Sequence, residues 1–167
     1  WGWDAPKTKG AVAALAALSE GLAMRGAEGD LDRAREIGDE SLDMWPPRAR
    51  PFYLTHMLHL HANTLAWRGE YERSLALSNR TRSIAREVHS PEAVLRGEGL
   101  EALALAGLGR HEEAIVIWDE LFEVQKELGG PRRVVLNYSA LAYREVYDLA
   151  EARARSEESL ELSAGMP

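Results

Sequence analysis

Three histidines in the segment His56 to His61, which reads HMLHLH, are the side chains of this chain best suited to bind a metal ion. On a helix, His56 and His59 share one face, whereas His61 points about 140° away from His56. Two imidazoles on one face cannot close a tetrahedral zinc site without a ligand from another helix. We therefore expect no metal, and we expect His61 to be a core histidine hydrogen-bonded to a neighbouring carbonyl.

Two further sequence patterns match those of catalytic or cofactor-binding sites. Glu98 and Glu101 could in principle share acid–base work, but no nucleophile or oriented base lies at a supporting spacing. The run from Gly97 to Ala102 has the pattern of a dinucleotide-binding turn, yet no strand precedes it and the repeat spacing places it inside a helix. We expect its glycines to allow close helix packing. We expect no cofactor and no enzymatic activity.

The elements that carry these residues are marked by glycines and prolines with a common period. Both residue types recur every 40 positions, at Gly29, Gly69 and Gly109 and at Pro51, Pro91 and Pro131. A glycine after a helix often takes the left-handed conformation, and a proline suits the first turn of the next helix. A fourth unit is shifted to 38, where Asp148 to Ala152 repeats the pattern of Asp30 to Ala34.

Each unit is predicted to be a pair of antiparallel helices. A two-helix unit cannot bury its apolar stripe alone, so we predict an all-α fold in which about four pairs stack as an α-solenoid, in one domain over residues 1–167. The units span about 9–46, 51–88, 91–129 and 131–163. The first helices fall near 9–27, 52–67, 91–107 and 132–146, and the second near 30–44, 71–88, 111–128 and 148–163.

This pattern resembles the tetratricopeptide repeat, a helix–turn–helix unit with a Gly-acid-aromatic turn, a small residue early in the second helix and often a closing proline. Gly69-Glu70-Tyr71 and Gly109-Arg110-His111 match the turn. The other matches are Ala34, Ala114 and Ala152, then Trp118, Tyr143 and the closing Pro46. The longer period and Ser74 in place of Ala depart from the family. Units this long resemble the helical-repeat regions of bacterial MalT-like transcriptional regulators and of signalling ATPases and adenylate cyclases.

The resemblance implies a right-handed superhelix whose first helices line a concave, peptide-binding groove. The groove residues that it implies are His56, His59, Asn63 and Trp67 in the second unit, Arg96 in the third and Asn137 in the fourth. The polar side chains would supply hydrogen bonds and Trp67 a flat apolar wall; tight helix packing around Trp67 is the alternative. The expected function is a non-catalytic scaffold for a protein or peptide. The alternative is a domain of a larger bacterial regulator, ATPase or cyclase that senses a small-molecule effector.

The amino-acid composition restricts the kinds of partner that we expect this domain to bind. The formal charge of −7 argues against nucleic-acid binding by this domain. No segment reaches the roughly 18 apolar residues that span a membrane, and the absence of cysteine favours a reducing, cytoplasmic compartment. The chain begins at Trp1, so we expect a fragment of a longer protein. The Ala-rich helix around 11–17 must pack closely on a preceding helix or on a second copy, as a homodimer. A basic patch is a further candidate surface, formed by Arg73, Arg80, Arg82 and Arg86.

Overall fold

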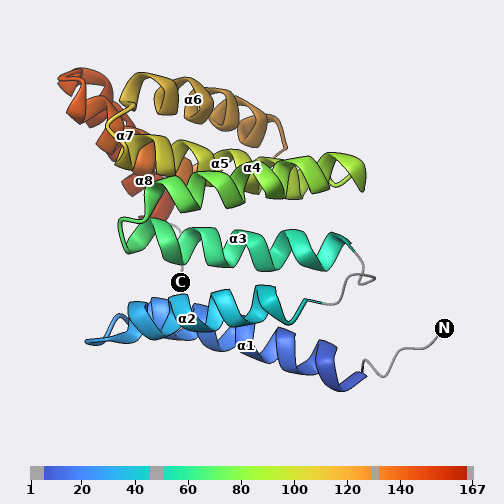
Figure 1. Ribbon diagram of the computed structural model, residues 1–167. Helices are drawn as coiled ribbons and strands as arrows, with labels where there is room; N and C mark the ends of the chain where they lie inside the picture. Colours follow the sequence, from blue (N-terminus) through green and yellow to red (C-terminus); the bar gives the residue numbers. More distant parts are fainter. Residues whose placement is uncertain (1–5, 46–50, 129–131, 165–167) are drawn as a thin grey trace. The chain divides into compact units, whose positions relative to one another are not determined.

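The computed structural model describes residues 6–45, 51–128 and 132–164, with the side chains of all of these except 6–13 and 52. These residues form eight α-helices, and no strand occurs among them (Figure 1). The helices are α1 (Pro6–Arg25), α2 (Asp30–Asp43), α3 (Pro51–Trp67), α4 (Tyr71–Glu87), α5 (Pro91–Gly107), α6 (His111–Leu128), α7 (Arg132–Glu145) and α8 (Leu149–Ala164). Every bound lies within three residues of the predicted one, so the all-α expectation is confirmed.

The helices are packed as sequential antiparallel pairs and fall into two compact units, Trp1–Leu100 and Glu101–Pro167. In the first unit α1 packs on α2, both of them contact α3, and α3 packs on α4 (Figure 1). In the second unit α6 contacts α7, and α7 packs on α8. None of the helices within 6–45, 51–128 and 132–164 combines the length and apolar character that crossing a membrane requires.

The inter-helix turns explain the spacing of the glycines. Gly29, Gly69 and Gly109 all have positive φ, at 79°, 80° and 77°. At the second of these turns the Gly69 and Glu70 amides donate to the carbonyls of Ala66 and Leu65, which ends α3 with satisfied backbone groups. The fourth turn keeps the conformation without the glycine, because Tyr147 has a φ of 62°.

Small residues bring the helices of a pair together, as predicted. Ala34 and Ala114 are fully buried, whereas Ala152, the third predicted position, is only half-buried. Ser74 takes the place of alanine in the second pair, where its hydroxyl donates to the Ala62 carbonyl at 2.8 Å across α3 and α4. Trp118 is buried in the second unit and stacks on Tyr138, with ring centroids 6.1 Å apart.

At Gly97 the structure confirms that a glycine of the run in α5 allows close helix packing. A Cβ at Gly97 would lie 2.6 Å from Cγ of Arg82 on α4. The residue is therefore a point of close approach between two helices within the first unit. Two other predicted features, Pro46 and Pro131, lie outside the described residues, as do the side chains of Ala11 to Ala13.

Candidate functional site

The candidate site begins with the face of α3 that its neighbours leave open. Among the described side chains of this helix only Pro51, Tyr53, His56 and Trp67 are exposed. Most of the others are buried, because α1 and α2 cover one side of the helix and α4 another. His59 and Asn63 are half-buried and lie between His56 and Trp67 at helical spacing. The structure therefore places four of the predicted groove residues on one partly open stripe.

Tyr53 extends this stripe by one turn, although it is not among the groove residues predicted from the sequence. It lies three residues before His56 and is 53% exposed, against 38% for Trp67. The polar residues of the stripe are thus flanked by an exposed aromatic at each end. We call the surface formed by Tyr53, His56, His59, Asn63 and Trp67 the α3 stripe.

His59 is the most perturbed ionisable group of the α3 stripe. Burial lowers its pKa to about 4, and the nearby positive charge of Arg96 and the imidazole of His56 act in the same direction. His59 is therefore neutral at pH 7. Its Nδ1 is shielded from solvent and has no hydrogen-bond partner among the described residues.

Arg96 on α5 is a predicted groove residue that acts electrostatically on the α3 stripe, because its positive charge lowers the pKa of His59. Its guanidinium is half-exposed and donates to Glu92 one turn earlier at 2.5 Å. Asn137, by contrast, belongs to the second unit, where its side-chain oxygen accepts a hydrogen bond from the Ser159 hydroxyl at 2.6 Å.

His61 is a core histidine, as expected, but its predicted partner is wrong. Its Nε2 lies 2.8 Å from the carboxylate Oδ1 of Asp39 on α2, rather than from a backbone carbonyl. Burial lowers the pKa of His61, although Asp39 acts to raise it. The neutral ring therefore donates its Nε2 proton to Asp39, and Gly38 makes room for the ring, since a Cβ there would lie 2.0 Å from Nδ1 of His61.

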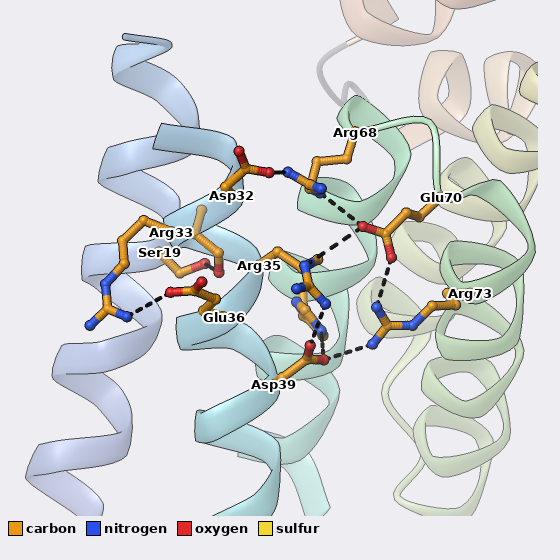
Figure 2. Close-up of polar contacts among 11 residues, drawn as sticks. Ser19, Asp32, Arg33, Arg35, Glu36, Asp39, Arg68, Glu70 and Arg73 are labelled. Carbon is orange, nitrogen blue, oxygen red and sulfur yellow. Dashed lines mark hydrogen bonds and ion pairs between the residues drawn. The ribbon is translucent and has the colours of Figure 1, made fainter. Parts of the chain in front are cut away.

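A network of ion pairs extends from this contact and fixes α3 between α2 and α4 (Figure 2). Arg73 of α4 bridges two acids, because it donates to Asp39 and to Glu70 at 2.7 Å each. Glu70 also accepts from Arg68 at 2.8 Å, and Arg68 pairs in turn with Asp32 of α2. Burial acts to raise the pKa of Asp39, but the hydrogen bonds from His61 and Arg73 outweigh it and lower that pKa.

The second unit has an acid that plays the same part at an equivalent position. Asp119 lies 80 residues after Asp39, which is twice the repeat period. Its carboxylate accepts from the Tyr143 hydroxyl of α7 at 2.7 Å and from Arg155 of α8 at 2.9 Å. Burial and the hydrogen bond to Asp119 raise the pKa of Tyr143 to about 12. In both units, a carboxylate on the second helix of one pair thus binds side chains from both helices of the next pair.

The other sequence candidates have structural partners. Arg73 belongs to the network, Arg86 lies 3.8 Å from Glu98, and Arg82 donates to Asn79 at 2.8 Å, so the expected basic patch consists largely of paired arginines. No three histidine or acidic side chains in the described part of the chain lie close enough together to hold a metal ion.

Comparison with known proteins shows which fold the chain has. No family model and no curated protein matches the sequence. A crystal structure of the nearly identical TPR-like repeats of a presumed kinesin light chain from Podosopora anserina matches with a TM-score of 0.65 at 17% identity, over 92% of this chain and 75% of that one. A variant of the same repeats, in which one glutamine is replaced by methionine, matches with a TM-score of 0.68 at 17% identity, over 92% of this chain and 74% of that one. The helix pairs, their glycine turns and these matches show that the chain has the fold of a TPR-like repeat protein.

Proposed function

We propose that the protein is a binding scaffold and that the α3 stripe, with Arg96 beside it, holds an extended segment of a partner protein. The observation that carries this proposal is the pair of exposed aromatic residues, Tyr53 and Trp67, on the open face of an otherwise buried helix. Tyrosine and tryptophan dominate the binding energy of protein interfaces, whereas polar residues between them set orientation.

The length of the stripe suggests the size of the bound segment. Tyr53 and Trp67 are 14 residues apart on the helix, which corresponds to about 21 Å at 1.5 Å per residue. An extended peptide advances about 3.3 Å per residue, so six or seven residues would span both aromatics. His56 and Asn63 would then face the peptide backbone, for which each has suitable hydrogen-bonding groups.

A heptapeptide selection tests this proposal. Peptides selected from a random phage library on the immobilised protein would be synthesised, and their affinities measured by isothermal titration calorimetry. We expect Tyr53→Ala and Trp67→Ala each to weaken binding at least about tenfold, as truncation of an interface aromatic does. The matched control is Val116→Ala, which removes an exposed apolar side chain of α6 in the second unit.

The outcomes separate the two candidate functions. Peptides that bind all variants equally would place the binding surface elsewhere and overturn the proposal. A small molecule that raises the melting temperature, and that loses this effect in Trp67→Ala, would favour a sensor domain instead. The partial exposure of Trp67 fits an open surface better than an enclosed ligand cavity.

A further inference from the structure

Helix α3 differs from the other helices in its charge. None of its 17 residues is an aspartate, glutamate, lysine or arginine, whereas each of the other described helices contains at least four such residues. A charged segment of a partner would lose part of its hydration on this helix without gaining an ion pair. The open face of α3 therefore favours a partner segment that is itself uncharged.

The groups beside the α3 stripe add no net charge to it. Arg96 on α5 is the basic residue whose charge acts on His59. Its guanidinium is paired with the carboxylate of Glu92 on the same helix, at 2.5 Å. The imidazole of His59 is neutral at pH 7, because burial lowers its pKa to about 4. The surroundings of the α3 stripe thus agree with the lack of charge on α3.

The hydrogen-bonding groups of the α3 stripe restrict the partner further. Each of its side chains can donate a hydrogen bond, and the indole of Trp67 can only donate. The backbone carbonyls of α3 are bonded within the helix, so they cannot accept from the amides of a partner. Proline has a backbone carbonyl but no N–H group. A proline-rich backbone can therefore accept from these donors and has few amides that need a partner of their own.

The spacing of the aromatic residues fits a segment of this kind. Tyr53, His56, Asn63 and Trp67 lie within a sector of about 80° around the helix axis, at about 100° per residue. Tyr53 and Trp67 are 14 residues, or about 21 Å, apart along this face. A polyproline II helix rises about 3.1 Å per residue, so about seven residues of it cover the same length.

We propose that the partner segment is rich in proline and binds the α3 stripe as a polyproline II helix, an inference that rests on the proposed function and names the chemistry of the partner. Tyr53 and Trp67, which are 53% and 38% exposed, each pack on a proline ring. His56 and Asn63 donate to the carbonyls between these rings. A polyproline II segment is extended and stiff before it binds, so it loses less conformational entropy on an open surface than a flexible peptide does.

Fluorescence polarisation with two labelled probes tests this partner chemistry. One probe is an oligoproline of nine residues, and the other is an uncharged peptide of nine alternating alanine and serine residues. We expect only the oligoproline to bind. Tyr53→Ala and Trp67→Ala should each weaken its binding at least about tenfold, whereas the matched control Val116→Ala should not. All three side chains are exposed, so the fold is retained, as circular dichroism would verify.

Charge provides a second readout. Because no ion pair forms in the proposed complex, Arg96→Gln should leave the affinity for oligoproline unchanged. An increase in sodium chloride from about 0.05 M to about 0.5 M should have no effect either, since salt weakens only interactions between charges. An acidic partner segment would behave differently, because peptides from the phage selection would then lose affinity in Arg96→Gln and at high salt.

The outcomes separate failure of this proposal from failure of the proposed function. An oligoproline that does not bind overturns the proposal. Selected heptapeptides that lose affinity in Trp67→Ala but are not enriched in proline also overturn it, although the α3 stripe would remain the binding face. An oligoproline that binds the wild type and Trp67→Ala equally well would reject the α3 stripe itself, and with it both the proposal and the proposed function.

Discussion

Replacement of Gly38 by alanine is the sharpest test of how α2 and α3 are packed. A methyl group at this position would lie 2.0 Å from Nδ1 of His61 and 2.6 Å from its Cε1. Both distances are far below van der Waals contact, so either the imidazole leaves its site or α2 moves away from α3. The first response breaks the hydrogen bond to Asp39, and the second opens the α2–α3 interface.

Three effects set the size of the change in the free energy of unfolding. Overpacking of a filled interior costs about 1–3 kcal/mol. Loss of a partner for a buried polar group costs about 1–3 kcal/mol more. Alanine improves helix propensity over glycine by about 1 kcal/mol, which offsets part of this. We expect Gly38→Ala to destabilise the protein by about 3 kcal/mol, the middle of the resulting range.

Urea denaturation followed by circular dichroism measures this effect in two backgrounds. In His61→Ala the ring is absent, so Gly38→Ala should there be neutral or slightly stabilising. Gly21→Ala is the matched control, because Gly21 also lies within a helix and a Cβ there would have no neighbour within 4 Å among the described residues. This variant should be more stable than the wild type by up to about 1 kcal/mol. An equal cost of Gly38→Ala in both backgrounds would refute the contact between Gly38 and His61.

Three further predictions concern turns, pH and helix packing. Tyr147→Gly should stabilise the protein by about 1 kcal/mol in thermal denaturation, because a tyrosine with positive φ is strained, whereas Gly109→Ala should cost about as much; equal melting temperatures would contradict this. His59 has a folded pKa of about 4 against 6.5 when unfolded, so it contributes stability above pH 6.5 that is lost as the pH falls toward 4. The loss in the free energy of unfolding amounts to about 3 kcal/mol at most. His59→Gln should therefore make the free energy of unfolding depend less on pH between 6.5 and 4. Ser74→Ala should cost no more than about 1 kcal/mol in urea denaturation, because only the bond to the Ala62 carbonyl is lost; a larger loss would mean that the hydroxyl does more than the structure shows.

The helix boundaries could be predicted because local residues determine them. Glycine adopts positive φ more readily than other residues, so Gly69 and Gly109 mark the ends of α3 and α5 without knowledge of the tertiary structure, whereas α1 ends before Gly26 and Gly29 directly precedes α2. Tyr147 shows the limit of this rule, since the surrounding pairs impose the same conformation on a residue that disfavours it.

The partners of buried polar groups could not be predicted in the same way. Asp39 is 22 residues from His61 in sequence, and only the packing of α3 on α2 brings the two together. A weak signal did exist, because Asp39 and Asp119 keep twice the repeat period. Tyr53 was missed for a different reason: the stripe inferred from the family resemblance began at His56, one turn too late.

The most direct test of the proposed binding face follows the indole signal of Trp67 by ¹H–¹⁵N NMR during titration with a selected heptapeptide. Trp67→Phe would assign the signal, and Trp118 serves as an internal reference because its side chain is buried in the second unit. We expect the Trp67 signal to shift in a saturable way while the Trp118 signal stays in place. A peptide that binds without shifting the Trp67 signal would contradict this expectation.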